Sequence, residues 1–237
     1  MRQIPPEFQA IMATIADNLQ AVRARIGRAA SAARRDPAEV TLLAVSKTHP
    51  PARVREAMAA GQRAFGENYL QEALEKLAAA PEAEWHLIGP LQSNKTRLAA
   101  ERFHWVQTVA TEKIARRLSE QRPASMAPLN VLVQVNISGE ASKAGARADE
   151  IPALARSIAG LKGLRLRGLM AIPEPGAPRE RFREVSMLYV RLKAELGLDT
   201  LSMGMSDDLE HAIAEGATMV RIGTAIFGQR HNVRSAA

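Results

Sequence analysis

The sequence predicts an α/β protein, a single TIM (β/α)8 barrel with an extra N-terminal helix. Apolar runs that suit buried strands alternate with helical patterns, and this alternation is typical of a parallel sheet. Eight such strand–helix units fit within about 200 residues, which is the size of a closed barrel. Apolar residues make up 46% of the chain, enough to fill a sizeable core. An open, doubly wound sheet is the structural competitor, because one miscounted strand would break the closure.

The first predicted element is an amphipathic helix from Pro6 to about Arg35. Two adjacent prolines favour its start, and the Asp36-Pro37 pair favours its end. Its apolar residues recur at the helical spacings of three and four: Phe8, Ile11, Ile15, Leu19, Val22 and Ile26.

Eight strands follow, each succeeded by a helix. Continuous apolar runs such as VTLLAVS suit strands that are buried on both faces, and the segments between them carry helical patterns. The predicted strands are Val40–Ser46, Arg63–Gly66, Glu84–Gly89, His104–Val109, Leu129–Ile137, Leu164–Ile172, Thr200–Met205 and Met219–Ile222. The predicted helices are Pro51–Ala60, Tyr69–Ala79, Lys95–Glu101, Glu112–Arg122, Glu150–Leu161, Arg179–Leu196, Asp208–Glu215 and Thr224–Phe227.

No linker, internal repeat or low-complexity tract divides the chain, so we expect one domain over residues 1–237. Within it, residues 1–36 hold the N-terminal helix, 40–228 the barrel and 229–237 a tail. The PEPGAP segment at 173–178 is short enough to be a loop at the mouth of the barrel.

The charge pattern argues against a nucleic-acid-binding protein. The net charge is +7, but the basic residues are spread from Arg2 to Arg234, and aromatic residues that stack on bases make up only 4%. We therefore expect a solvated basic surface.

Several other classes of protein are excluded or disfavoured. The chain has no cysteine, which excludes a disulfide framework, a thiolate metal site and a cysteine nucleophile. The five histidines are well separated, so we predict no metal site. No run reaches the roughly 18 apolar residues that span a bilayer, and the N-terminus, with Glu7 and Asp17, does not resemble a signal peptide. We expect a cytoplasmic protein with no membrane partner.

Lys47 is the candidate nucleophile. Barrel enzymes place functional residues at the carboxyl ends of their strands, and Lys47 lies there, ending the apolar face that carries Leu43 and Val45. A buried lysine is costly unless it is paired or chemically used, and burial lowers its pKa toward that of an amine able to form a Schiff base. The alternative is a lysine whose ammonium reaches solvent at the strand end.

The last two strands carry a candidate anion site. The loops after strands seven and eight of a barrel usually bind phosphate. Gly223 lets the backbone approach an anion, Thr224 adds a hydroxyl, and Ser206 precedes a helix. The alternatives are a turn that merely needs glycine and a helix cap, with Asp207 and Glu210 as a capping box. If Ser206 binds an anion, the two aspartates that follow it must turn away.

Further polar residues lie at the ends of other strands. Asn68 follows the second strand, His86 lies on the third, where a lone histidine is more often a core residue, and Arg221 lies on the eighth. An amine beside a phosphate site implies one of two chemistries: a Schiff-base aldolase acting on a sugar phosphate, or pyridoxal 5′-phosphate (PLP) held as an imine.

Eight motifs make the chain resemble a known family. Between about Val40 and Gly228 they run in order as AVSKT, FGENY-QE, WH-IGPLQ-NK, VNIS, SK-G, RGLMAIP, SMGMS-D and RIGT-IFG. They are similar to the motifs of the pyridoxal phosphate homeostasis proteins, the YggS/PROSC type. The resemblance implies a fold-type III PLP barrel like the N-terminal domain of alanine racemase.

The resemblance also implies a set of cofactor-binding residues. Lys47 would carry PLP as an internal aldimine, Ser206, Gly223 and Thr224 would hold the phosphate, Arg221 would face the pyridine nitrogen, and Asn68 and His86 would lie near the ring. If Lys47 is not the attachment site, Lys95 and Lys143 are its likeliest substitutes.

These residues predict a binding protein without strong catalytic turnover. PLP is the best electron sink when its ring nitrogen is protonated, and a permanently charged Arg221 beside that nitrogen disfavours protonation. Racemases of this fold type add a second acid/base from a β-domain, whereas nine residues follow Gly228 here. We expect a monomeric PLP carrier in vitamin B6 and amino-acid homeostasis, with PLP-dependent apo-enzymes as acceptors. The alternatives are a PLP-dependent, racemase-like enzyme and, from charge alone, an RNA-binding or scaffold protein.

Overall fold

The computed structural model describes residues 14–137, 144–174 and 176–229, and its strands form a closed parallel barrel. The strands of the ring are β1 (Thr41–Val45), β2 (Ala64–Glu67), β3 (Glu84–Leu87), β4 (Trp105–Val109), β5 (Leu129–Asn136), β7 (Leu164–Ala171), β8 (Thr200–Ser202) and β9 (Met219–Ile222). The ring closes through the pairing of β4 with β5 and of β1 with β9. The predicted eight-stranded barrel is therefore confirmed, and the open sheet is excluded.

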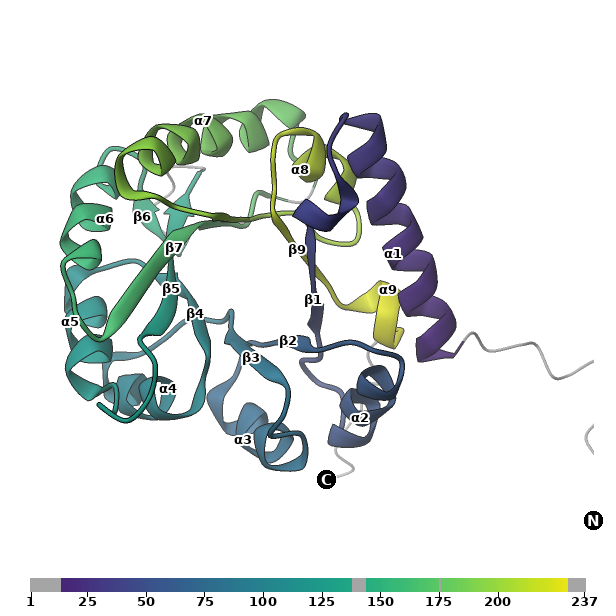
Figure 1. Cartoon of the computed structure of the whole chain (residues 1–237), viewed down its shortest axis with the longest axis horizontal. Helices are drawn as coiled ribbons and strands as arrows, with labels where there is room; N and C mark the ends of the chain where they lie inside the picture. The colour runs from purple at the N-terminus through teal and green to yellow at the C-terminus, as the bar shows by residue number, and fades with distance from the viewer. Residues whose placement is uncertain (1–13, 138–143, 175, 230–237) are drawn as a thin grey trace, which may run out of the picture.

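Helices surround the ring of strands (Figure 1). They are α1 (Ile15–Ala32), α2 (Pro51–Ala59), α3 (Leu70–Ala79), α4 (Thr96–Arg102), α5 (Glu112–Gln121), α6 (Ile151–Ala159), α7 (Arg179–Leu196), α8 (Leu209–Ala214) and α9 (Thr224–Phe227). Short 3-10 turns, η2 (Pro37–Glu39) and η3 (Ser93–Lys95), precede β1 and α4. Figure 1 shows α1 packed along the outside of the barrel beside α8 and α9.

The structure adds one strand that the sequence does not predict, β6 (Ala146–Arg147). It pairs in parallel with Val135 and Asn136 at the end of β5. On that edge β4 pairs with β5 only as far as Val133. The backbone N–H and C=O groups of β5 beyond Val133 therefore form their hydrogen bonds with β6 instead. A two-residue segment has no recognisable periodicity, which is why the sequence gives no sign of it.

The predicted start of the first helix is wrong. Thr14 has an extended backbone conformation and caps α1, forming a reciprocal capping box with Asp17. The helix therefore begins at Ile15, and the part predicted from Pro6 up to residue 13 lies outside the described residues. The rest of the apolar stripe is confirmed, since Leu19, Val22 and Ile26 are buried against the barrel.

Alternation along the strands separates two apolar regions. Val220 and Ile222 of β9 belong to the large cluster shared with the helices, whereas Met219, on the other face of the strand, joins a small separate cluster inside the ring. That inner cluster contains Leu43, Val45, Ala64, Ile88 and Met219. The interior is thus filled with side chains, as expected of an eight-stranded barrel.

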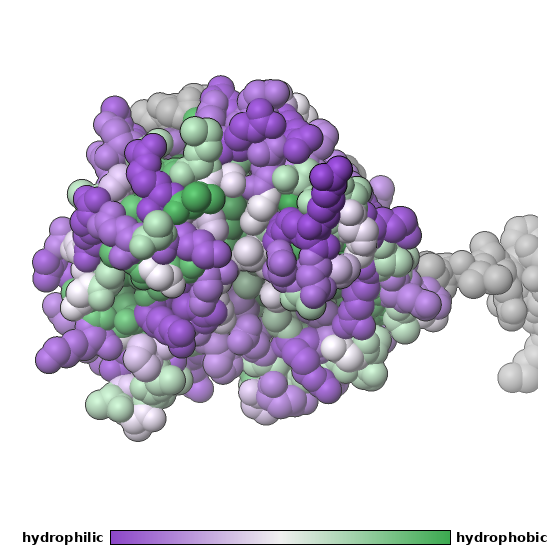
Figure 2. All heavy atoms as spheres, turned by 45° about the horizontal axis from the view of Figure 1, so that its top comes forward, coloured by the Kyte–Doolittle hydropathy of each residue, from purple (hydrophilic) through white to green (hydrophobic). Residues whose placement is uncertain are grey.

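Figure 2 shows a surface that is mostly hydrophilic, with small apolar areas between charged residues. Among the described residues, no helix is long and apolar enough to cross a membrane.

Candidate functional site

A pocket of about 300 Å³ opens at the carboxyl ends of the barrel strands. Six of the seven predicted site residues line it, and they come from four different strand ends. The lining residues are Val45, Lys47, Asn68, Ile88, Ile172, Met205, Ser206, Asp207, Arg221, Gly223 and Thr224. Because parallel strands end at one rim of a barrel, residues 177 positions apart in the chain meet in one site.

Lys47 lies in the turn after β1 and reaches this pocket. It is half-buried, which lies between the predicted buried amine and the alternative of a lysine that reaches solvent. Among the described residues the buried lysine is instead Lys76, which is 2% exposed. The next residue, Thr48, has a φ of 67°, a left-handed conformation that a β-branched side chain strongly disfavours.

Arg221 is almost fully buried at the pocket. Its guanidinium donates hydrogen bonds of 2.8 Å to Ser202 Oγ and of 2.8 Å to the carbonyl of Ala171. Burial lowers the pKa of Arg221 to about 10, so the group still carries its positive charge at neutral pH. An arginine offers only donors, and it therefore faces an acceptor in any ligand.

The predicted anion loops follow the neighbouring strands β8 and β9, and both loops line the pocket. Gly223 is the N-cap of α9, and a Cβ atom placed on it would lie 3.1 Å from the carbonyl oxygen of Val45. Glycine therefore lets the backbone come close to β1 beside the hydroxyl of Thr224. Ser206 lies in the loop between β8 and α8 and also lines the pocket.

The predicted capping box of α8 is wrong. Its N-cap is Asp208, which makes no side-chain cap hydrogen bond to the helix. Asp208 Oδ1 instead accepts the backbone N–H of Met205 at 2.5 Å. Asp207 contributes to the pocket lining, so its turning away from an anion stays a prediction.

The N-terminal helix holds both anion loops from outside. Arg25 of α1 donates to the carbonyl of Ser206 at 2.6 Å and forms a two-pronged ion pair with Glu210 at 2.5 and 2.6 Å. This hydrogen-bonded pairing raises the pKa of Arg25 and lowers that of Glu210. Asn18 of the same helix donates to the carbonyl of Ile226 in α9 at 2.9 Å. No sequence pattern predicts this role of α1, because these contacts bridge about 200 residues.

Asn68 follows β2 and is half-buried in the pocket wall. Gly89 packs against its backbone so closely that a Cβ atom there would lie 2.0 Å from the Asn68 carbonyl oxygen. Only glycine therefore permits this approach of the strand-end loops. The sequence motif that contains Gly89 does not reveal that this glycine places Asn68, because the two residues meet only in the folded chain.

The structure does not bring His86 into the pocket lining. His86 is fully buried inside the barrel, stacked on Trp105 with ring centroids 5.0 Å apart. Its Nδ1 lies 2.9 Å from Gln107 Nε2, and its Nε2 lies 2.8 Å from Glu84 Oε1. Burial lowers the pKa of His86, although Glu84 opposes the shift.

The buried polar groups around His86 lead to Arg221. Ser202 Oγ donates to Gln107 Oε1 at 2.7 Å and accepts from Arg221. Because Gln107 Nε2 is a donor, His86 accepts at Nδ1 and is neutral. The chain of hydrogen bonds thus fixes the orientation of Arg221 from beneath the pocket.

The two substitute lysines are not placed at the site. Lys95 ends η3 and does not belong to the pocket lining, and Lys143 lies outside the described residues. Within the described ranges, no group of histidine and carboxylate side chains is arranged to hold a metal ion.

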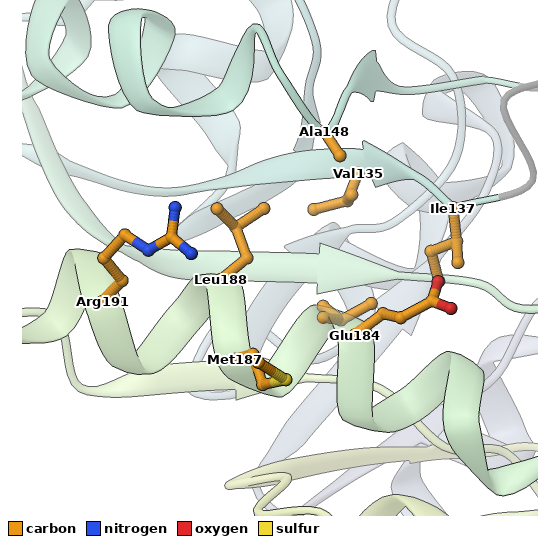
Figure 3. A pocket seen from close by; sticks show the side chains of 8 residues that line it. Val135, Ile137, Ala148, Glu184, Met187, Leu188 and Arg191 are labelled. Atoms are coloured by element: carbon orange, nitrogen blue, oxygen red, sulfur yellow. The ribbon is translucent and has the colours of Figure 1, made fainter.

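A second pocket, of about 330 Å³, lies between α7 and the strands β5 and β6 (Figure 3). Its floor is apolar, and its charged lining side chains are Glu184 and Arg191 on α7. No lysine belongs to its described lining, so it is not a candidate for Schiff-base chemistry.

Comparisons with known proteins show the family of the chain, and this family agrees with the geometry of the site. Residues 18–231 match the family model of the alanine racemase N-terminal domain, so the fold and the site define a barrel of that class. The curated pyridoxal phosphate homeostasis protein of Pseudomonas aeruginosa is 62% identical over 223 residues, covering 92% of this chain and 97% of that protein. The protein of the same name from Escherichia coli K12 is 53% identical over 229 residues, covering 92% and 98%. The chain belongs to the pyridoxal phosphate homeostasis protein family.

Solved structures agree with this assignment. PipY of Synechococcus elongatus PCC7942, in a structure with PLP bound, is 37% identical with a TM-score of 0.80, covering 91% of this chain and all of that one. Alanine racemase of Corynebacterium glutamicum, at 17% identity and a TM-score of 0.70, covers 94% of this chain and 62% of the racemase and shares its fold.

Proposed function

We propose that the protein binds PLP and holds it covalently through Lys47. The observation that carries this proposal is the convergence of an amine, a buried arginine and two anion loops on one pocket of about 300 Å³, a volume typical of cofactor sites. In this reaction Lys47 Nζ adds to the aldehyde carbon, a C=N bond forms and water leaves. PLP when bound supplies an electrophilic imine carbon and an electron-withdrawing ring.

The residues of the pocket fit the groups of the cofactor. Gly223, whose missing side chain lets its backbone pack closely against β1, forms the phosphate cradle with Thr224 and Ser206. Arg221 donates toward the pyridine nitrogen because it has no acceptor to offer. Asn68 borders the ring. PLP bound to PipY, a relative with 37% identity, supports the choice of ligand.

We also propose that the protein lacks strong catalytic turnover. A charged Arg221, held by Ser202 and the Ala171 carbonyl, keeps a proton off the pyridine nitrogen and so weakens the ring as an electron sink. No histidine, tyrosine or cysteine belongs to the described pocket lining, and Asp207, the carboxylate that does, lies in the loop that bears the anion-binding Ser206.

The biological role proposed here is homeostasis of PLP, and with it vitamin B6 and amino acids, in the cytoplasm. The name shared by relatives with 62% and 53% identity supports it. PLP-dependent apo-enzymes are the proposed acceptors, and the protein is proposed to act as a monomer.

The test compares two ligands. PLP should give a yellow complex that borohydride bleaches, whereas pyridoxine 5′-phosphate, which lacks the aldehyde, should bind through its phosphate without colour. Incubation of the PLP complex with amino acids in D2O should leave the α-hydrogen in place on the time scale of an enzyme. Lack of any PLP binding overturns the proposal, and rapid α-deuteration favours the racemase-like alternative.

A further inference from the structure

A buried charged cluster lies behind the turn that carries Lys47. It consists of Glu67 at the end of β2 together with Glu72 and Lys76 on α3. Lys76 is 2% exposed and Glu67 is fully buried. Lys76 Nζ lies 2.8 Å from Glu67 Oε1 and 2.6 Å from Glu72 Oε1. None of the three residues belongs to the pocket lining.

The cluster is bonded to both residues that flank Lys47. On one side, Lys76 Nζ donates to the carbonyl of Ser46 at 2.7 Å, and Ser46 Oγ donates to Glu67 Oε1 at 2.5 Å. On the other side, the Glu72 carboxylate accepts the backbone N–H of Thr48. The three hydrogens of the Lys76 ammonium therefore each have an acceptor, one of them in the Lys47 turn.

These contacts explain how the turn keeps an unfavourable shape. Thr48 has a φ of 67°, and such a conformation persists in a β-branched residue only when its surroundings impose it. The Glu72 carboxylate holds the N–H of this strained residue in place. Fixing the backbone before and after Lys47 limits the directions in which its side chain can leave the turn.

The composition of the cluster is not what stability alone would favour. Buried ion pairs are frequently no more stabilising than apolar residues of the same volume. Glu67 Oε2 is buried without a hydrogen-bond partner, and burial raises the pKa of this carboxyl although Lys76 opposes the shift. Such a costly arrangement, hydrogen-bonded to both residues that flank Lys47, indicates that the position of this turn matters.

We infer that Glu67, Glu72 and Lys76 are positioning residues that aim the Lys47 amine at the aldehyde of the bound cofactor. The inference rests on the proposed function, since it requires a carbonyl group in the pocket. An amine that is oriented before it reacts favours imine formation, because the Lys47 side chain then loses less conformational entropy when the bond forms. The phosphate cradle lies at the ends of other strands, and none of the three cluster residues belongs to it.

Glu72 is the residue to test, because it is 28% exposed and its removal leaves room for water rather than a buried unpaired charge. Glu72→Ala removes the carboxylate that accepts hydrogen bonds from the Thr48 N–H and from Lys76. Glu72→Gln keeps an acceptor oxygen at the same place. Glu75→Ala, on the exposed side of α3, is the matched control. Each full-length variant is titrated with PLP, read by imine absorbance, and with pyridoxine 5′-phosphate, read by calorimetry. Hydrogen exchange of the Thr48 amide reports on the turn without any ligand.

Glu72→Ala is expected to weaken imine formation about tenfold, as loss of hydrogen bonds to a charged group implies. Its affinity for pyridoxine 5′-phosphate should stay within about twofold of the wild-type value, and its Thr48 amide should exchange faster. Glu72→Gln should recover most of the imine, and Glu75→Ala should behave as wild type.

Two results overturn the inference while leaving the proposed function intact. One is a Glu72→Ala variant that forms the imine as readily as the wild type. The other is an equal loss of affinity for both ligands, which would mean that Glu72 supports the barrel in general and does not orient the amine. Absence of a Lys47 imine in the wild-type protein overturns the proposed function and this inference together.

Discussion

The contact of the N-terminal helix with the Ser206 loop allows a prediction that separates two interactions of one side chain. Arg25→Met removes the hydrogen bond to the Ser206 carbonyl and the ion pair with Glu210, while the methionine keeps the apolar stem of the side chain. Glu210→Gln removes only the charge of the ion pair. The pair of variants therefore isolates the hydrogen bond that holds the anion loop.

The expected magnitudes differ for the two interactions. The arginine and glutamate side chains are 32% and 48% exposed, so their ion pair is worth at most about 1 kcal/mol. A hydrogen bond from a charged donor to a partly buried carbonyl is worth about 1.5–3 kcal/mol. If about 1.4 kcal/mol of that is lost from the ordering of the loop, the affinity for a phosphate-bearing ligand falls about tenfold.

Calorimetric titration with pyridoxine 5′-phosphate measures that affinity without the Schiff base, and urea unfolding measures the stability of each variant. We expect Arg25→Met to bind about tenfold more weakly and Glu210→Gln to bind within about threefold of the wild type. Equal losses in the two variants, or unchanged binding in Arg25→Met, would refute the reasoning.

Three further predictions concern the pocket and the barrel interior. Lys47→Ala should abolish the borohydride-sensitive absorbance with PLP while circular dichroism stays unchanged, and a remaining reducible absorbance would point to another lysine. Gly223→Ala should weaken ligand binding in calorimetry because its Cβ lies 3.1 Å from a backbone oxygen, whereas Gly27→Ala, with nothing within 4 Å, should not; equal binding would contradict the cradle. Stability in urea should fall as the pH drops below about 6.5. The side chain of residue 86 binds a proton in the unfolded chain, whereas in the folded protein His86 stays neutral because its Nδ1 accepts a hydrogen bond from Gln107. His86→Gln should reduce this fall between about pH 6.5 and pH 5, before most carboxylates titrate, and an unchanged pH dependence would show that His86 does not cause it.

The barrel was predictable because its signal is local. Each ring strand is a short apolar run followed by a helical pattern, and the order of such units along the chain is their order around the ring. Exceptions arise where tertiary contacts decide the structure. β6 forms because the end of β5 has an edge with which it can pair. The helix α1 begins after the N-cap Thr14, and the apolar residues that precede Thr14 in the sequence continue the helical pattern, so the pattern does not reveal this cap.

The residues of the site could be predicted at the ends of the strands, but the layer of the barrel interior in which each one lies could not. Residues that close a strand of a barrel meet at its rim, so Lys47, Asn68 and Gly223 fall together without any knowledge of loops. His86 lies on the same face of its strand as Ile88 but two residues earlier, and this offset puts it one layer below the pocket that Ile88 lines.

The buried cluster behind Lys47 had no signal in the sequence. Lys76 occupies a polar position in an ordinary helical pattern, and only the packing of α3 on the barrel buries it. Its partners Glu67 and Ser46 lie 9 and 30 residues away, so their pairing depends on the closed fold.

Peptide mapping after reduction determines whether one amine at the barrel mouth, that of Lys47, carries the cofactor. The wild-type protein is saturated with PLP, reduced with borohydride, digested and analysed by mass spectrometry. We expect a single pyridoxyl phosphate adduct, on Lys47. An adduct on Lys76, Lys95 or Lys143 in place of Lys47, or no adduct at all, would contradict it.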